Sequence, residues 1–144
     1  MSWLKAMMEK EPPEPENPIG TIVIGNLDPD RHENPKEMVR KSLKKALFKI
    51  IDLGKKVPAE TFAAKAKEVN ADIIAVSVNM DPAKKNLQNV VSAIEAEGLK
   101  GKVMVMIGGA AVDKEDADKI GAWFGTTREE AVALAKKAMA EKKV

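Results

Sequence analysis

The chain contains a single histidine, and a carboxylate precedes it by two positions in the sequence Asp30-Arg31-His32. The neutral imidazole of a histidine can coordinate a transition metal through one ring nitrogen. A carboxylate that accepts a hydrogen bond from the other ring nitrogen fixes the tautomer of such a ligand. Asp30 and His32 are therefore a candidate metal-binding pair, with His32 as the ligand. The alternative is an ordinary surface histidine in a polar loop.

Two further candidate sites follow apolar runs of the sequence. Ser77 comes directly after the run of residues 73–76, and the pair Gly108-Gly109 follows the run of residues 103–107. Glycine has no Cβ, so a glycine pair lets the backbone approach a ligand closely, although it also suits a tight turn. Ser77 is either a ligand-facing hydroxyl or simply the polar end of a strand.

Apolar runs alternate with segments of helical periodicity after Gly20. The runs are short and rich in Val and Ile, which is typical of buried strands. Strands are expected at residues 21–25, 49–54, 72–77, 102–107 and 122–124. Between and after these runs, apolar residues recur every three or four positions, which indicates amphipathic helices. Helices are expected at residues 35–48, 59–69, 82–97, 113–120 and 126–140.

Capping residues mark the starts of two of these helices. Asn34 is a suitable N-cap for the first helix, with Pro35 at its first position and Glu37 three residues after the cap. Thr126 or Thr127 is the expected N-cap of the last helix, because a glutamate follows at the spacing of a capping box.

Five strand-then-helix units with apolar strands predict an α/β fold in which helices cover both faces of a parallel sheet. The handedness rule for crossover connections leaves few topologies, and we expect the flavodoxin-like (Rossmann-like) strand order 2-1-3-4-5. In this order the switch point lies between the first and third strands, so a ligand should contact the loops after Gly25 and Ser77. The first of these loops, residues 26–34, is long for its class and contains His32.

The first 18 residues differ in composition from the rest of the chain. Four prolines fall between residues 10 and 18, which favours an extended linker. Trp3 and its apolar neighbours suit a short helix that docks on this domain or on a partner, and the alternative is a disordered tail. The expected organisation is a Pro-rich tail or linker over residues 1–18 and one α/β domain over residues 19–144.

Composition argues against several classes of function and location. The net charge of +2 and the 3% aromatic content disfavour a nucleic-acid-binding surface. The chain has no cysteine, so disulfides and thiolate metal sites are excluded. No apolar run reaches the roughly 20 residues of a membrane span, and the N-terminus does not resemble a signal peptide. A cytoplasmic protein without membrane contact is expected.

Three separated elements, in this order and at this spacing, resemble the cobalamin-binding domain of corrinoid-dependent methyltransferases and mutases. That family carries Asp-x-His-x-x-Gly after its first strand, Ser-x-Leu at the end of its third and Gly-Gly after its fourth. Here the corresponding sequences are Asp30-Arg31-His32-Glu33-Asn34-Pro35, Ser77-Val78-Asn79 and Gly108-Gly109. The similarity, which extends to methionine-synthase-like members, covers residues 19–142.

The resemblance implies a cofactor and a role for each site residue. Cobalamin would bind at the carboxyl ends of the strands, with its nucleotide tail inserted into the domain. His32 would be the lower axial ligand of the cobalt in place of the benzimidazole, and Asp30 would hydrogen-bond to His32. Ser77 would help to hold the displaced benzimidazole, and Gly108 and Gly109 would line the channel for the tail.

The leading hypothesis from this resemblance is a corrinoid-binding subunit that carries a methyl group between partner methyltransferase subunits, with its oligomeric state left open. The family motif is altered, because Pro29 and Pro35 replace glycines and Asn79 replaces a leucine. These changes favour a second hypothesis, a scaffold or regulator of the same fold that binds no corrinoid. A third hypothesis is the small subunit of an adenosylcobalamin mutase. A phosphate-receiver domain would need an aspartate where Ser77 stands.

Overall fold

The computed structural model describes residues 9–142, and the apolar N-terminal residues around Trp3 lie outside this range. The chain forms one five-stranded sheet in which every pairing is parallel. The strand order is β2-β1-β3-β4-β5, so the predicted flavodoxin-like topology is confirmed. The strands are β1 (Thr21–Asn26), β2 (Lys49–Asp52), β3 (Ile73–Ser77), β4 (Met104–Gly108) and β5 (Trp123–Phe124).

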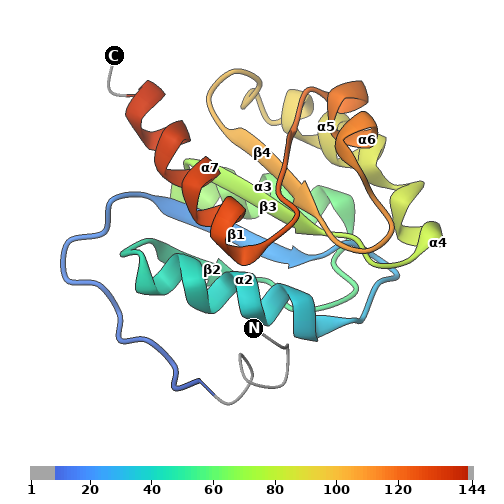
Figure 1. Cartoon of the computed structure of the whole chain (residues 1–144). Helices are drawn as coiled ribbons and strands as arrows, with labels where there is room; N and C mark the ends of the chain where they lie inside the picture. Colours follow the sequence, from blue (N-terminus) through green and yellow to red (C-terminus); the bar gives the residue numbers. More distant parts are fainter. Residues whose placement is uncertain (1–8, 143–144) are drawn as a thin grey trace.

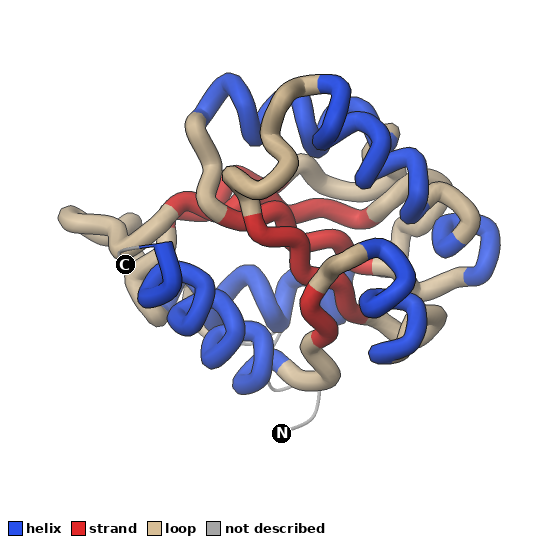
Figure 2. Tube along the Cα trace, turned by 90° about the horizontal axis from the view of Figure 1, so that it is seen from above, coloured by secondary structure: helices blue, strands red, loops and turns tan. Residues whose placement is uncertain are grey.

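Helices cover both faces of the sheet, as Figure 1 shows and as the view from above in Figure 2 makes clear. One face packs against α2 (Glu33–Lys45) and α7 (Arg128–Lys142), which also contact each other. The opposite face is covered by α3 (Ala59–Val69), α5 (Leu87–Ala96) and α6 (Lys114–Ile120). None of the helices within residues 9–142 has the length and apolar composition of a membrane-spanning segment.

Alternation along the strands divides the core into two halves, because successive side chains of a strand point to opposite faces. Ile22 and Ile24 of β1 pack on the side of α2 and α7, whereas Val23 packs on the side of α3 and α5. In β4, Met106 and Ile107 separate in the same way. Both faces are covered, so the strands need apolar residues at almost every position.

The first helix begins two residues earlier than its capping pattern predicts. α2 starts at Glu33, His32 occupies the N-cap position and Pro35 is the third helical residue. The prediction of Asn34 as N-cap with Pro35 at the first position is therefore wrong. A proline is tolerated at the third position because the N–H groups of the first turn have no acceptor within the helix.

The predicted single helix over residues 82–97 is in fact two helices, α4 (Asp81–Lys84) and α5, which are separated by Lys85 and Asn86. The Asn86 side chain donates a hydrogen bond to the backbone carbonyl of Asp28, 2.7 Å away in the loop after β1. This contact joins residues that are far apart in the sequence, so no local pattern indicated the break.

The predicted capping of the last helix is confirmed. The Thr127 hydroxyl accepts a hydrogen bond from the backbone N–H of Glu130 at 3.1 Å, and the Glu130 carboxylate accepts one from the N–H of Thr126 at 2.8 Å. These contacts satisfy one donor of the first turn of α7 and one donor of the residue before its N-cap. They also fix the loop before α7 at the carboxyl edge of the sheet.

Residues 9–18 contain no helix or strand and contact α2 through acidic side chains. Glu11 accepts two hydrogen bonds from the Arg40 guanidinium, at 2.6 and 2.7 Å, and one from Lys44 at 2.8 Å. Glu9 accepts a hydrogen bond from Arg128 at the start of α7, at 2.9 Å. These ion pairs tether the segment to both helices that cover this face of the sheet.

The Glu11→Gln protein is expected to be less stable than the native protein at pH 7 by less than about 1 kcal/mol, because the side chain is half exposed. Hydrogen bonds from Arg40 and then Lys44 lower the pKa of Glu11 from 4.5 to about 2. The stabilisation is therefore fully present above pH 4.5 and is lost as the pH falls toward 2. Urea unfolding of the two proteins between pH 7 and pH 3 measures this difference.

The matched control is Glu16→Gln, at an exposed position of the same segment. It should unfold at the same urea concentration as the native protein throughout this pH range. A stability difference for Glu11→Gln that stays constant on acidification would show that the ion pair is not its cause.

Candidate functional site

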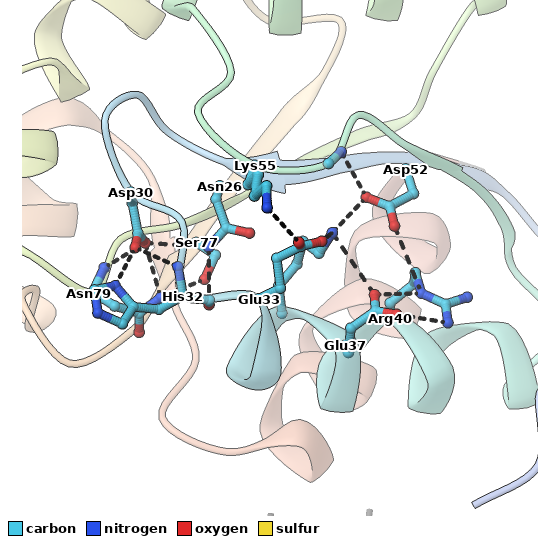
Figure 3. A network of polar contacts seen from close by, with 12 residues as sticks. Asn26, Asp30, His32, Glu33, Glu37, Arg40, Asp52, Lys55, Ser77 and Asn79 are labelled. Carbon is cyan, nitrogen blue, oxygen red and sulfur yellow. Dashed lines mark hydrogen bonds and ion pairs between the residues drawn. The ribbon is translucent and has the colours of Figure 1, made fainter. Parts of the chain in front are cut away.

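The candidate site lies at the carboxyl ends of β1 and β3, at the expected switch point of the sheet. Asp30 and His32 come from the loop between β1 and α2, and they face Ser77 and Asn79 at the end of β3 (Figure 3). The structure thus brings three predicted site residues together from two segments that are more than 40 positions apart in the sequence.

Asp30 and His32 are in direct hydrogen-bond contact. The Asp30 side chain is fully buried, whereas 58% of the His32 side chain is exposed, and the His32 Nδ1 atom lies 2.7 Å from Asp30 Oδ1. A carboxylate can only accept a hydrogen bond, so Nδ1 carries the proton and Nε2 of the neutral ring is left as the acceptor. The contact fixes the tautomer and restricts the orientation of the ring, as the carboxylate partner of a metal-ligating histidine does.

The Asp30 carboxylate accepts hydrogen bonds from five N–H groups. Its Oδ1 atom accepts from the backbone N–H and from Nδ1 of His32, and its Oδ2 atom accepts from Asn26 Nδ2 and from the backbone N and Nδ2 of Asn79. Burial raises the pKa of Asp30, but the donors of His32, Asn26 and Asn79 outweigh burial and hold the pKa below its ordinary value. Asp30 is therefore anionic and its position is set from two strands.

A cavity of about 570 Å³ opens between α2 and α7, above the carboxyl ends of β1, β3 and β4. Its lining includes the predicted residues Ser77, Gly108 and Gly109, but not Asp30 or His32. Asn79 lines the cavity and also contacts Asp30, so it connects the two parts of the site. The deeper wall is mostly apolar and consists of Ile24, Val39, Ala75, Met106, Ile107, Phe124 and Ala131.

The cavity exists because several of its lining residues are small. Ala75 of β3 and Ala131 of α7 both border it, and neither fills the space between the helices as a Leu or Ile would. Pro35 also borders the cavity without closing it. The replacement of the family glycine by Pro35 therefore leaves the space available for a ligand.

The two glycines after β4 allow close approach between backbone segments of this chain. Gly109 has a φ of +122°, and a Cβ at this position would lie 2.2 Å from the Val78 carbonyl oxygen. A Cβ at Gly108 would lie 2.9 Å from the Gly125 carbonyl oxygen. Both glycines border the cavity, so the close packing of their loop defines the position of its wall.

A buried lysine anchors α2 beside the cavity. The Lys36 side chain is fully buried, and its Nζ atom lies 2.8 Å from Asp52 at the end of β2 and 3.4 Å and 3.7 Å from Glu33 and Glu37. Several carboxylates around one ammonium group offset the cost of its burial. This network, seen around Asp52 in Figure 3, ties the first turns of α2 to β2 and so holds one wall of the cavity.

Sequence analysis assigned no site role to Asn26 or Lys36, and it singled out Asn79 only as the replacement of a family leucine. Asn26 is the last residue of β1, and Asn79 follows β3 by two positions. A polar residue at the carboxyl end of an apolar strand, where ligands bind in this fold, is a sequence signal that could have identified both. Lys36 gave no such signal, because it occupies an amphipathic helix in which a lysine is expected to face solvent.

Comparison with known proteins gives one family match. The B12 binding domain family model matches residues 20–135 of the chain. The chain is also 42% identical over 123 residues to the dimethylamine corrinoid protein of Methanosarcina barkeri, in a match that covers 85% of this chain and 58% of that protein. The chain thus spans less than two thirds of the length of this curated relative.

Two solved structures share the fold. A cobalamin-binding protein from Desulfitobacterium hafniense DCB-2 has a TM-score of 0.79 and 30% sequence identity, over 83% of this chain and 58% of that chain. A methanol:cobalamin methyltransferase complex from Methanosarcina barkeri has a TM-score of 0.81 and 22% identity, over 86% of this chain and 48% of that chain. At that identity the second likeness concerns the fold alone.

Proposed function

Because this chain belongs to the B12-binding domain family, we propose that it binds cobalamin or a related corrinoid and carries a methyl group between methyltransferase partners. One observation carries the proposal, namely an oriented imidazole next to an apolar cavity. His32 is held by Asp30 at 2.7 Å, and Asn79 connects Asp30 to the wall of a cavity of about 570 Å³.

The residues present fit such a cofactor. A corrinoid would bring most of the ligands of its cobalt with it, so the protein would need to add only one. A neutral imidazole nitrogen is well suited to a transition metal, and Nε2 of His32 is the ring nitrogen that remains an acceptor. The cavity has apolar walls with Ser77 and Asn79 at its polar edge, which suits a heterocyclic base attached to a polar linker.

Each site residue then has a distinct role in binding. His32 would provide Nε2 as the protein ligand of the cobalt, and Asp30 holds its ring through Nδ1. The Ser77 hydroxyl accepts a hydrogen bond from Asn79 Nδ2 at 3.0 Å, which leaves its proton to donate to a base in the cavity. Gly108 and Gly109 form part of the wall around the tail. Bound cobalt would supply the capacity to accept and release a methyl group.

The relatives suggest which methyl groups the protein handles. The curated relatives include a dimethylamine corrinoid protein and a trimethylamine corrinoid protein. We propose that the partners are methyltransferases for small methylated compounds, with methylated amines as the first choice. A module without corrinoid is not favoured, because Pro35 leaves the cavity open and the contact between Asp30 and His32 is formed.

Titration of the full chain with hydroxocobalamin tests the proposal. The absorption spectrum should change on binding, because Nε2 of His32 would take the place of the benzimidazole as a cobalt ligand. Cobinamide, which lacks the nucleotide tail, should bind at least about tenfold more weakly, since it leaves the cavity empty. A spectrum that stays that of free cobalamin would exclude cobalt ligation by this chain, and equal affinity for cobinamide would exclude a role of the cavity in tail binding.

A further inference from the structure

The Asn79 side chain contacts three segments at the carboxyl edge of the sheet. Its Nδ2 group donates to Asp30 Oδ2 at 2.9 Å and to the Ser77 hydroxyl at 3.0 Å. Its Oδ1 atom accepts a hydrogen bond from the backbone N–H of Ala110 at 3.1 Å. One side chain therefore joins the loop after β1, the end of β3 and the loop after β4.

The amide group is required for this linkage. Nδ2 donates to two acceptors while Oδ1 accepts from a backbone N–H, and only a side chain with both functions can do this. Leucine has nearly the same size but neither function. With a leucine at position 79, the carboxylate of Asp30 would keep the backbone N–H of that residue as a donor, which lies at 2.8 Å in the native chain. It would lose the side-chain Nδ2 group, one of its five donors.

The linkage runs from the wall of the cavity to the candidate metal ligand. Gly109 and Ala110 border the cavity, Ala110 donates to Asn79, Asn79 donates to Asp30, and Asp30 holds the His32 ring. Gly109 packs so closely against the Val78 carbonyl, next to Asn79, that there is no room for a Cβ at position 109. A change in the position of any of these loops is therefore expected to move Asp30 and, with it, the ring of His32.

We propose that Asn79 is a positioning residue that acts through Asp30 to orient His32 toward the cobalt of a bound corrinoid. The proposal rests on the proposed function and deepens it, since it names the residue that connects the tail cavity to the axial ligand. Asn79 would not be a cobalt ligand itself, because its amide group is engaged by Asp30, Ser77 and Ala110.

The first test compares Asn79→Leu and Asn79→Ala with the native chain. Both variants should bind hydroxocobalamin about tenfold more weakly, because each removes a hydrogen bond to a buried charged group. His32 is the only histidine, so histidine labelled with ¹⁵N at its ring nitrogens marks the ring of His32 alone. In the Co(II) state, splitting of the electron paramagnetic resonance lines by ¹⁵N should report a smaller fraction of cobalt bonded to His32 in both variants. Native affinity and native splitting in both variants would overturn the proposal.

A double-mutant cycle shows whether Asn79 acts through His32. In the His32→Ala background, Asn79→Leu should cause little further loss of cobalamin affinity, because the ligand that it positions is already gone. A second tenfold loss in that background would show that Asn79 only shapes the cavity, and the proposal would be wrong. The matched control is Asn89→Leu, on the exposed side of α5, which should leave affinity and splitting unchanged.

Measurements on the cofactor-free protein separate this inference from the proposed function. Asn79→Leu should increase the hydrogen-exchange rate of the Ala110 amide about tenfold and should broaden or shift the ring ¹⁵N signals of His32. If the native chain binds no corrinoid, the proposed function fails while these two signals still report the linkage. Unchanged His32 ring signals in Asn79→Leu would overturn the positioning role whether or not corrinoid binds.

Discussion

The His32→Ala protein is expected to bind hydroxocobalamin at least about 100-fold more weakly than the native chain and to lose the spectral signature of an axial protein nitrogen. Replacement of groups that merely support a metal ligand already costs 10–100-fold in affinity, and this substitution removes the ligand itself. The loss should not come from unfolding, because His32 has an exposed side chain and makes no side-chain cap for α2. Equilibrium titration followed by absorption measures both effects.

Arg31→Ala is the matched control, since Arg31 is an exposed neighbour in the same loop. It should retain the native affinity and spectrum. Residual binding in His32→Ala should depend on the nucleotide tail, because the cavity is unaltered. Native affinity in His32→Ala would mean that the imidazole does not bind cobalt, and the central claim of the proposed function would be lost.

The Gly109→Ala protein is expected to lose more than about 3 kcal/mol of unfolding free energy. Two costs combine at this position. A residue with a side chain is strained by about 1–3 kcal/mol at such a φ value, here +122°, and the new Cβ would lie 2.2 Å from the Val78 carbonyl oxygen. The two nearest atoms are backbone atoms of Val78, which cannot turn aside as the end of a side chain could, so the loop after β4 has to move. Chemical denaturation of the cofactor-free protein measures the loss.

Gly98→Ala separates the two costs. Gly98 also has a positive φ, of +74°, but a Cβ there would meet nothing within 4 Å. Its substitution should therefore cost only the backbone strain, about 1–2 kcal/mol. If Gly109→Ala is no more destabilising than Gly98→Ala, then the close approach between the loops after β3 and β4 adds no steric cost to a side chain at position 109.

The carboxyl edge of the sheet also shows why some features could be predicted and others could not. The capping of α7 at Thr127 was predictable, because its partner Glu130 is three residues away. The break between α4 and α5 was not, since Asn86 is held by the backbone of Asp28. The start of α2 was misplaced because Asn34 and Pro35 suit several positions of a first helical turn equally well.

The sequence by itself determined the parallel sheet, its strand order and the pairing of Asp30 with His32. These follow from periodicity, from the handedness of crossovers and from residues two positions apart, all of which are local or generic rules. Only the tertiary structure decided that Asn79 joins three strand ends, that Lys36 is buried, and that small residues leave a cavity beside Pro35. Such features depend on which distant segments come into contact, and a hydrogen bond between residues 49 positions apart has no signature in either segment alone.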